Sequence, residues 1–320
     1  MKKNIKYNSD QPFVEILLST YNGEAYLKDL LDSIFDQTYK NWRIIIRDDL
    51  SFDSTPGIID AYGKNYPDQI RILDNPGVNL GPSQSFHLLL EAGRAECMAF
   101  CDQDDYWMPD KLEIQVGKLN EAENKFGKDI PLLVHSDLQV YDNNMTIMSD
   151  SFWAYQNIAP GEMKDIRCLL VQNFVTGCTV LINRRLADIA IPIPQQAIMF
   201  DWWLALLAQE LGKIITIQTP LVKYRQHGNN AVGAKKWGFN YVISQIFEKK
   251  SLWRTSLENT WFQADALINR LESVGVEDHD IIQQYSRLYE KPWITRKVLY
   301  MMLGIRKYGN LRQFITWLLI

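Results

Sequence analysis

The sequence predicts an α/β fold in which a mostly parallel sheet carries helices on both faces, with a helical appendage at the C-terminus. Two observations predict this fold. Short apolar runs alternate with helix-like segments through the first part of the chain, which is typical of parallel sheets. From about Lys235 onward the pattern is helical and rich in aromatic residues. We therefore expect an α/β domain over residues 1–232 and a helical region over residues 233–320.

The first strands are expected where four or five mostly apolar residues follow one another, because strands of a parallel sheet are buried on both faces. These runs lie at residues 14–18, 43–46, 70–73 and 98–101. Helices are expected between them, at residues 25–35, 56–66 and 83–93. Ser54 or Thr55 is the expected cap of the second helix, since Pro56 suits its first turn.

Further elements follow the fourth strand. A helix is predicted at residues 110–126 and a strand at 132–136. Residues 173–183 are predicted as a glycine-containing strand, 199–211 as a helix and 214–224 as a strand. These elements carry the α/β domain to about residue 232.

The composition argues against several classes of protein. A formal net charge of −4 is not that of a general nucleic-acid-binding protein. No apolar run reaches the length of a transmembrane helix, and residues 1–12 lack the apolar core of a signal peptide. The four cysteines form no CxxC pair, so we expect reduced core thiols rather than a zinc site. We therefore expect a cytoplasmic protein.

Three carboxylates stand within four residues at the end of the fourth apolar run. Asp102, Asp104 and Asp105 are separated only by Gln103. The carboxyl ends of parallel strands converge at one edge of the sheet, where ligands bind. Crowded carboxylates repel one another unless a cation lies among them, and their oxygens suit Mg²⁺ or Mn²⁺, which in turn bind phosphates. The motif predicts a metal–diphosphate site. The alternative is an acidic loop that caps the next helix.

Two earlier strands also end in polar residues. The first is followed by Ser19-Thr20-Tyr21-Asn22-Gly23-Glu24, and the second by Arg47-Asp48-Asp49-Leu50-Ser51. Neither has the GxGxxG pattern of dinucleotide sites. A carboxylate after the second strand is able to accept the imide N–H of uracil or thymine. Each loop alone is also consistent with an ordinary turn, but polar ends on successive βα units predict a single nucleotide site.

Several motifs together carry a family resemblance. They are Ser19-Thr20-Tyr21-Asn22-Gly23, Asp48-Asp49-Leu50-Ser51-Phe52-Asp53, Asn79-Leu80-Gly81 and Asp102-Gln103-Asp104-Asp105. From about Val14 to Val232 the chain resembles the inverting glycosyltransferases of family 2, which have the GT-A fold. A further set is similar to bacterial rhamnosyltransferases of cell-surface polysaccharide synthesis. It comprises Asp102 to Trp107, Phe174 to Cys178, Asp201-Trp202-Trp203 and Tyr224 to Asn230.

The resemblance assigns roles to the matching positions. Asp104 would bind the cation directly, Asp201 would be the general base, and either Asp48 or Asp49 would contact the nucleobase. It leaves Asp105 without a role. The nucleotide-binding residues would be Thr20, Tyr21, Asn22, Glu24, Asp48, Asp49, Asn79, Asp102 and Gln103.

Two further groups have open alternatives. Gly177, Cys178, Trp202 and Trp203 fall where the family lines the acceptor and sugar pocket, and the alternative for them is core packing. His227 and Arg225 lie in a turn rich in glycine and asparagine, where the histidine would bind the metal and the arginine the diphosphate. The alternative for His227 is a loop histidine bonded to the backbone.

The chemistry of inversion requires a base. In a direct displacement, a carboxylate opposite the leaving group must take the proton of the acceptor hydroxyl. Asp201 is the matching carboxylate, although many relatives have glutamate before the aspartate and this chain has Phe200. A divalent cation would neutralise the charge that develops on the leaving diphosphate.

The C-terminal residues have an unusual charge pattern. After Glu290 the chain has no acidic residue, and basic residues alternate with aromatic and aliphatic ones. The pattern favours contact with an anionic membrane surface over a helix pair docked on the domain. The basic residues are Lys291, Arg296, Lys297, Arg306, Lys307 and Arg312.

The resemblance and the residues together predict a metal-dependent inverting glycosyltransferase at the inner face of the cell membrane. By resemblance its donor is dTDP-L-rhamnose and its acceptor a lipid-linked saccharide. The nearest alternative is the same fold with a UDP-hexose donor. Alternatives from other classes are a metal-dependent phosphohydrolase and an inactive sugar-nucleotide-binding protein, and the presence of both Asp104 and Asp201 argues against the inactive protein.

Overall fold

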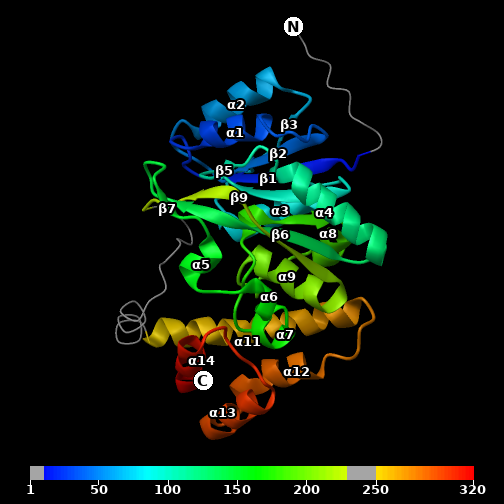
Figure 1. The fold of residues 1–320 in the computed structure, drawn as a ribbon, viewed down its shortest axis with the longest axis vertical. Helices are drawn as coiled ribbons and strands as arrows, with labels where there is room; N and C mark the ends of the chain where they lie inside the picture. Colours follow the sequence, from blue (N-terminus) through cyan, green and yellow to red (C-terminus); the bar gives the residue numbers. More distant parts are fainter. Residues whose placement is uncertain (1–10, 229–249) are drawn as a thin grey trace.

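A computed structural model describes residues 11–228 and 250–320 of the chain. A twisted central sheet carries helices on both sides, and a group of C-terminal helices lies at one end of the molecule (Figure 1). The sheet has nine strands in the order β3-β2-β1-β4-β8-β6-β9-β5, with β7 paired to β6. The predicted α/β class is confirmed.

One half of the sheet is parallel, as the alternation of strands and helices predicted. Strand β1 pairs in parallel with β2 and β4, and β2 pairs in parallel with β3. The register sets Thr20 opposite Asp48 and Ser19 opposite Asp102, so the polar ends of three strands meet at one edge. The strands are β1 (Val14–Thr20), β2 (Trp42–Asp48), β3 (Ile70–Ile72) and β4 (Cys97–Asp102).

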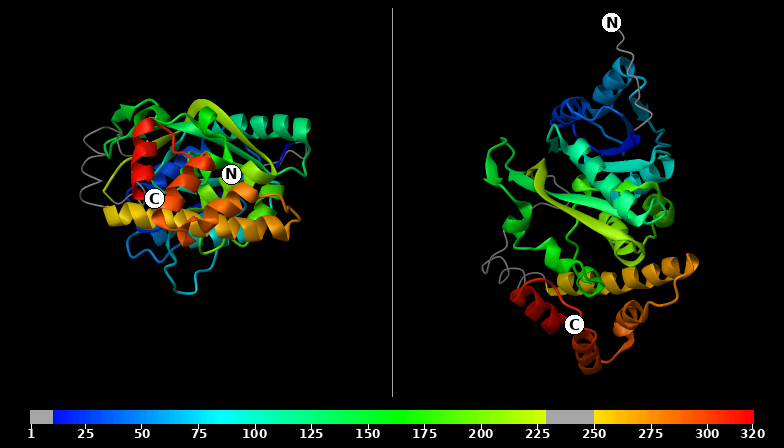
Figure 2. Two further views of the ribbon diagram at one scale, coloured as in Figure 1. Left: turned by 90° about the horizontal axis from the view of Figure 1, so that it is seen from below. Right: turned by 45° about the vertical axis from the view of Figure 1, so that its right-hand side comes forward.

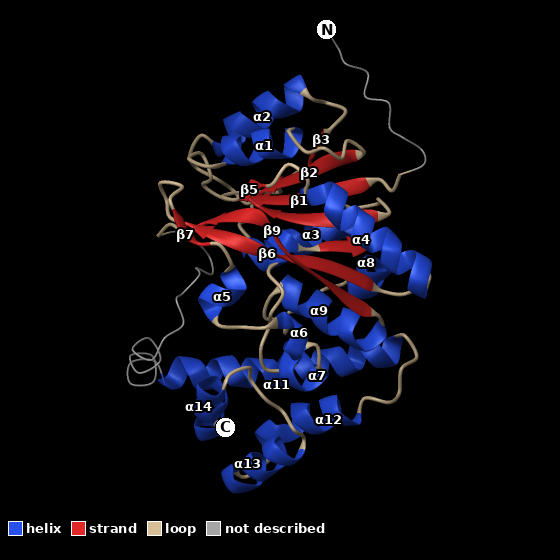
Figure 3. Cartoon of the chain, viewed as in Figure 1, coloured by secondary structure: helices blue, strands red, loops and turns tan. Residues whose placement is uncertain are grey.

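The other half of the sheet mixes directions. Strand β8 pairs antiparallel with β4 and β6, while β6 and β9 run parallel. The two-residue β5 pairs antiparallel with β9, so the chain just after the acidic motif is bonded to the end of β9. These strands, red in Figure 3, are β5 (Tyr106–Trp107), β6 (Leu132–Tyr141), β7 (Ile147–Ser149), β8 (Leu181–Asn183) and β9 (Lys213–Arg225).

The predicted strand at residues 173–183 is wrong for most of its length. Only its last three residues form β8, and Gly177–Thr179 forms a 3₁₀ turn, η1. Polar side chains compete for the backbone here, because Asn173 bonds to both the N–H and the carbonyl of Val175 and the Thr179 hydroxyl bonds to the Thr176 carbonyl. The turn brings Gly177 close to the start of the helix that contains Asp201.

Helices cover both faces of the sheet, and a separate hydrophobic core lies between the sheet and the helices on each face. One core includes residues of α1, α2 and α4, and the other includes residues of α3, α8 and α9. The helices over the first core are α1 (Leu27–Phe35), α2 (Thr55–Asn65) and α4 (Lys111–Phe126). Those over the second are α3 (Gly81–Ala92), α8 (Arg184–Ala190) and α9 (Phe200–Leu211). Three short helices, α5 (Phe152–Gln156), α6 (Pro160–Met163) and α7 (Ile166–Leu169), lie in the connection from β7 to η1.

The expected side-chain cap of α2 is wrong. Helix α2 begins at Thr55 with Pro56 in its first turn, but the side chain of Ser54 makes no cap hydrogen bond. The Thr55 hydroxyl instead accepts the backbone N–H of Gly23, and Asp53 accepts the N–H of Thr55. The residues expected to cap the helix thus tie together the loops that follow β1 and β2.

The C-terminal part is helical wherever it is described, from residue 250 onward. The long helix α11 lies between the α/β part and the last helices (Figure 2), and its Trp261, Ala264 and Leu267 belong to the second core. These helices are α11 (Lys250–Ser273), α12 (Asp280–Ser286), α13 (Trp293–Met302) and α14 (Asn310–Leu319), with the 3₁₀ turn η2 (Arg287–Glu290) after α12. The predicted boundary between residues 232 and 233 lies outside the described residues. Among the described helices, none combines the length and the apolarity needed to span a bilayer.

We predict that Gly212→Ala destabilises the fold, because Gly212 ends α9 directly against the backbone of Pro131. An added β-carbon would lie 1.7 Å from the Pro131 carbonyl oxygen, so the main chain would have to move. We expect the free energy of unfolding, measured in urea, to fall by ~2–4 kcal/mol. Gly117→Ala on α4, where an added β-carbon meets no atom within 4 Å, is the control and should be neutral or slightly stabilising. Equal stability of the two variants would contradict this prediction.

Candidate active site

The candidate site lies at the carboxyl edge of the parallel strands. Asp48 and Asp102 end β2 and β4, and the pairing register brings both beside the end of β1. Asp201 enters from the first turn of α9, and His227 from the chain just after β9. The structure therefore brings together the sequence-predicted carboxylates and the histidine from four separate elements.

The loops after β1 and β2 are held together by their predicted site residues. The Thr20 hydroxyl donates to Asp48 at 2.8 Å, and the Asn22 backbone N–H donates to the Ser51 hydroxyl at 2.8 Å. Glu24 accepts the backbone N–H of Ser54 at 2.9 Å. These contacts fix the two loops that would enclose a nucleotide.

Asp48 and Asp49 differ in their exposure and in their contacts. Asp49 is only 3% exposed, and its carboxylate accepts bonds from the Arg47 guanidinium and from the backbone N–H groups of Leu80 and Gly81. The Asn79 amide donates to the Asp49 carbonyl at 2.8 Å, so Asn79 supports the same loop. Asp48 is the more accessible of the two carboxylates. Asp48 also holds its loop, since it accepts the Thr20 hydroxyl and the Ser51 N–H and hydroxyl. Contact of either carboxylate with a nucleobase stays a prediction.

Gln103 connects the acidic motif to the first loop. Its amide forms a reciprocal pair with the Tyr21 backbone, in which the Tyr21 N–H donates to Oε1 and Nε2 donates to the Tyr21 carbonyl, each at 2.8 Å. A β-carbon at Gly23 would lie 2.3 Å from Gln103 Oε1, so a side chain at Gly23 would break this pair. The Tyr21 ring is 46% exposed beside the loop, where a nucleobase would have access to it.

The acidic motif concentrates negative charge in a poorly hydrated place. Burial, with the nearby charges of Asp104 and Asp201, raises the pKa of Asp102 to about 7. Burial also raises the pKa of Asp105 well above its ordinary value, and a hydrogen bond with the Cys178 thiol lowers it in part. Crowded buried carboxylates with raised pKa values are an environment that a bound cation would compensate.

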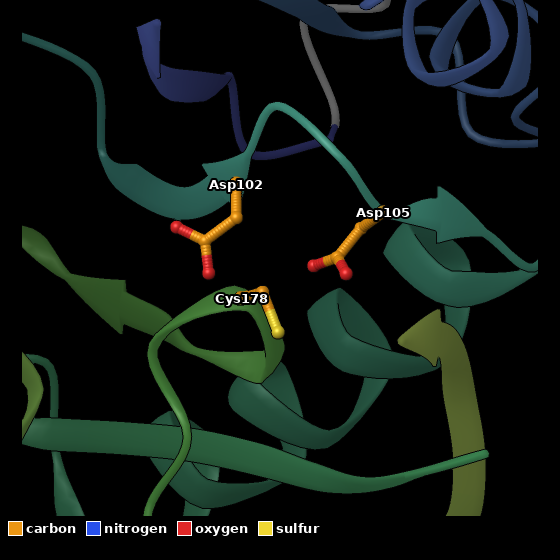
Figure 4. A group of neighbouring side chains, drawn as sticks. All are labelled: Asp102, Asp105 and Cys178. Atoms are coloured by element: carbon orange, nitrogen blue, oxygen red, sulfur yellow. The ribbon is translucent and has the colours of Figure 1, made fainter. Parts of the chain in front are cut away.

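Figure 4 shows how Asp102 and Asp105 lie on either side of the Cys178 thiol. The ligand atoms of these three residues all lie within 4.8 Å of one another. Cys178 is completely buried, which favours the alternative of core packing over a place in the acceptor pocket. Its thiol lies beside the carboxylates of the acidic motif. Behind it the buried Lys111 donates to Gln115 at 2.8 Å and lies 3.8 Å from the centre of the Trp107 ring, and its charge acts on Asp105.

His227 contacts the acidic motif from the chain just after β9. Its Nε2 lies 2.8 Å from Asp104 Oδ2, and both side chains are nearly buried. His227 therefore does not bond only to the backbone, and its role as a metal ligand stays a prediction. A carboxylate oxygen beside an imidazole nitrogen is a donor set that suits a divalent cation such as Mn²⁺. Arg225, expected at the diphosphate, is 5% exposed and pairs with Asp29 of α1 at 3.0 Å, so its contact with a diphosphate stays a prediction.

Asp201 has the environment of a general base. It is 7% exposed in the first turn of α9, and burial raises its pKa to about 7 although backbone N–H groups and the Asn173 amide partly stabilise the anion. Asn173 donates to Asp201 Oδ1 at 3.2 Å. A carboxylate with a pKa near neutrality is able both to accept and to release a proton at physiological pH.

Phe200, which replaces the usual glutamate, has a packing role. Its ring stacks on Phe100 of β4 and packs on Phe86 of α3, which fixes the start of α9 against the sheet. A β-carbon at Gly177 would lie 2.6 Å from the Phe200 ring and 3.5 Å from Asp201. Gly177 is therefore needed where η1 approaches the base.

The two tryptophans after Asp201 differ in their surroundings. Trp203 is completely buried and donates to the Ala190 carbonyl, so its assignment to the sugar pocket is wrong and it belongs to the core. Trp202 is partly exposed and donates to the Leu169 carbonyl at 2.7 Å. Only Trp202 of the pair is left as a candidate to contact a sugar.

The sequence analysis did not identify Asn173 or Tyr26. Asn173 orients Asp201 from 28 positions earlier in the chain, and Tyr26 stacks on His227. Neither residue stands in a local pattern that would reveal the contact, because both contacts join elements distant in sequence.

Comparison with known proteins identifies relatives of the chain. The model of the family described as "Glycosyl transferase family 2" matches residues 15–188. A dTDP-rhamnosyl transferase, RfbG, of Shigella flexneri is 26% identical over 283 residues, which cover 85% of this chain and 89% of that protein. Uncharacterized proteins of Mycobacterium tuberculosis and Mycobacterium bovis are 27% identical over 244 residues, and the chain spans 64% of their length and 76% of its own.

Solved structures share the fold. TarS residues 1–349 of S. aureus in complex with UDP-GlcNAc superimposes with a TM-score of 0.54 at 14% identity, covering 95% of this chain and 89% of that one. The mannosyltransferase PcManGT of Pyrobaculum calidifontis, in complex with GDP-Man and Mn²⁺, gives a TM-score of 0.53 at 14% identity, covering 95% and 77%.

We predict that Asp201→Asn stabilises the protein at alkaline pH. The pKa of Asp201 is about 7 in the folded state against an ordinary value of 3.8, so the folded state holds this proton more tightly than the unfolded chain. The stability that it contributes is therefore lost as the pH rises from about 4 to 7, and the buried anion is destabilising at pH 8. We expect the free energy of unfolding of Asp201→Asn in urea without added metal to be ~1–4 kcal/mol higher at pH 8, with a smaller gain at pH 5.5.

The control is Asp188→Asn, whose side chain is 55% exposed and lies 3.4 Å from Arg184. We expect this variant to change stability by less than ~1 kcal/mol at either pH. A loss of stability in Asp201→Asn at pH 8 would show that Asp201 is not a strained buried anion.

Proposed function

Because the chain belongs to glycosyl transferase family 2 and has the GT-A fold, we propose that it is an inverting, metal-dependent glycosyltransferase that uses a nucleotide-sugar donor. One observation carries the proposal. A carboxyl group with a pKa of about 7, Asp201, lies in the first turn of α9 close enough to the acidic end of β4 to raise the pKa of Asp102. In this proposal, the base and the motif that would bind the diphosphate lie side by side at the sheet edge.

The proposed reaction is a single displacement. The acceptor oxygen forms a bond to the anomeric carbon while the bond from that carbon to the diphosphate oxygen breaks. The acceptor hydroxyl's proton passes to the Asp201 carboxylate, and the electron pair of the broken bond leaves with the diphosphate. Asn173 and the backbone N–H groups at the start of α9 keep the carboxylate aimed during this transfer. Residues of the acidic motif hold the leaving group at the other side.

A divalent cation, Mg²⁺ or Mn²⁺, completes the proposed site. Asp104 and His227 would hold it, with Asp102 directed to the nucleotide. When bound, it would neutralise the negative charge that develops on the leaving diphosphate. The crowding of Asp102, Asp104 and Asp105 at one buried sheet edge supports a cation here, since burial and the neighbouring carboxylates raise the pKa values of Asp102 and Asp105. The Mn²⁺ in the complex of the fold relative PcManGT is compatible with this proposal.

We propose dTDP-L-rhamnose as the donor and a lipid-linked saccharide as the acceptor. The similarity to the dTDP-rhamnosyl transferase RfbG supports the donor. Asp48 would accept the imide N–H of thymine, with Thr20, Asn22 and Glu24 holding the surrounding loops. The alternative donor is a UDP-hexose, which the UDP-GlcNAc complex of TarS favours, since uracil presents the same imide group.

We predict that purified protein releases dTDP from dTDP-rhamnose faster than it releases UDP from UDP-hexoses when a lipid-linked acceptor is supplied, and that EDTA stops the release. Asp201→Asn should lower this rate at least ~100-fold, because the proton acceptor is lost. Binding of dTDP, measured by calorimetry, should stay close to that of the wild type. Transfer that survives in Asp201→Asn would refute the assignment of the base, and preference for a UDP-sugar would select the alternative donor.

The same proposal places the enzyme at the inner face of the cell membrane, where a lipid-linked acceptor is found. The segment of the last two helices docks on the protein through Tyr300, Ile305 and Ile320, which belong to the second core. Both helices also expose large apolar residues, and Lys297 of α13 lies over the Trp317 ring of α14, so the two helices are close together. We call this set of exposed residues the tail surface. It comprises Trp293 (64% exposed), Ile294 (60%), Val298 (45%), Met301 (54%), Met302 (77%), Phe314 (56%) and Leu318 (48%).

The basic residues beside the tail surface divide into two groups. Arg312 is 6% exposed and bonds to the Gln156 and Asn157 carbonyls, and Arg296 bonds to the Leu288, Tyr289 and Lys291 carbonyls, which precede α13, so these two serve the fold. Lys297 lies over the rings of Trp293 and Trp317, and Lys291 and Arg306 are exposed. Apolar side chains flanked by cations with no acidic residue after Glu290 match the chemistry of an anionic phospholipid surface.

We predict that the full-length protein floats with vesicles that contain phosphatidylglycerol and binds more weakly to pure phosphatidylcholine. Trp293→Glu combined with Met302→Glu should reduce the bound fraction about ten-fold or more, because each change places an anion in the apolar face. Phe126→Glu, at a 38% exposed aromatic residue at the end of α4, is the matched control and should bind like the wild type. Absence of vesicle binding, or a dimer in solution that the double variant dissociates, would refute the membrane assignment.

A further inference from the structure

The imidazole that lies next to Asp104 is stacked on a tyrosine. Tyr26, the residue before α1, has its ring 4.6 Å from the His227 ring, centre to centre, and the two planes are 19° apart. His227 Nε2 lies 2.8 Å from Asp104 Oδ2. Tyr26 thus contacts His227, and His227 contacts Asp104. These contacts connect the start of α1 with the end of β9 and the acidic motif.

Tyr26 is itself held from several directions. Its hydroxyl donates to Asn143 Oδ1 at 2.8 Å, and its backbone N–H donates to the Gly23 carbonyl at 3.0 Å. The Arg225 guanidinium lies 4.9 Å from the centre of the Tyr26 ring and pairs with Asp29 at 3.0 Å. Its position is therefore set by α1, by the turn that contains Asn143 and by the end of β9.

A histidine needs this kind of support to act as a ligand. The imidazole turns about two side-chain torsions, and only some orientations direct Nε2 at Asp104. Ligand histidines are commonly oriented by a partner that does not touch the metal, and loss of such a partner typically weakens metal affinity ~10–100-fold. Parallel stacking on a fixed aromatic ring restricts the orientation of the imidazole plane. The stacked ring would thus orient the histidine through dispersion and electrostatic contact, as a hydrogen-bond partner does for other ligand histidines.

We propose that Tyr26 is a positioning residue for the cation site, because its ring holds the plane of the His227 imidazole so that Nε2 faces Asp104. The inference rests on the proposed metal-dependent function and adds a residue that acts through His227. In this proposal the aromatic ring of Tyr26 orients His227, and the hydroxyl contributes little. Tyr26→Leu, which removes the ring, and Tyr26→Phe, which removes only the hydroxyl, should therefore differ in metal affinity.

The test uses full-length protein and Mn²⁺ alone as the probe. Free Mn²⁺ is measured by electron paramagnetic resonance during titration of the wild type, Tyr26→Leu and Tyr26→Phe. Tyr26→Leu, which keeps an apolar side chain but removes the stack, should weaken Mn²⁺ binding about ten-fold or more. Tyr26→Phe keeps the ring and should restore binding to within about two-fold of the wild type. Thermal unfolding of each variant, and dTDP binding in EDTA, check that α1 and the nucleotide loops are intact.

The outcomes separate this inference from the proposed function. If Asp104→Ala and His227→Ala bind Mn²⁺ as the wild type does, the proposed cation site is wrong. If those two variants lose Mn²⁺ while Tyr26→Leu binds as the wild type does, the cation site stands and the role of Tyr26 is refuted. If Tyr26→Phe is as weak as Tyr26→Leu, the hydroxyl and not the stack is responsible, which also refutes the proposal.

Discussion

Four carboxyl groups lie close together at a buried edge of the sheet, and neighbouring groups offset part of their mutual repulsion. They belong to Asp102, Asp104, Asp105 and Asp201. Burial raises the pKa of Asp102 and of Asp201 to about 7, and it also raises the pKa of Asp105 well above its ordinary value. The protein supplies only partial relief, through the Asn173 amide, the buried Lys111 and the His227 ring. Burying carboxyl groups side by side lowers the stability of the fold, and the proposed function gives a reason for it, since a cation, a diphosphate and a proton would all bind at this edge.

The sequence predicted the parts of this arrangement that depend on local pattern. Apolar runs located β1 to β4, and the polar residues after them located the edge where ligands bind. Pattern failed where the decisive contacts were distant in sequence. Residues 173–183 read as a strand, yet Asn173 and Thr179 bond to nearby backbone and break it into a turn. Trp203 resembled a sugar-stacking residue, but its exposure is decided by the packing of α9 on the second core, which no local pattern reports.

The loops of the site are built mainly from contacts between side chains and backbone. Gln103 bonds to the Tyr21 backbone, Asp49 accepts the N–H groups of Leu80 and Gly81, and Thr55 accepts the N–H of Gly23. Several residues that the family resemblance assigns to the nucleotide therefore serve the shape of the loops as well. A substitution at Asp49 or Gln103 would alter nucleotide binding through that shape, so loss of affinity alone would not identify a direct contact.

Asp104 and His227 stand 123 positions apart, yet a short ladder sets their spacing. Strand β5, immediately after the acidic motif, pairs Tyr106 with Lys223 and Trp107 with Val222 near the end of β9. The main-chain bonds of this ladder hold Asp104 and His227 at a fixed spacing, although β6, β8 and α9 lie between them in the sequence. A change in a loop of that intervening chain would therefore leave the distance between Asp104 and His227 unchanged as long as the ladder between β5 and β9 is kept.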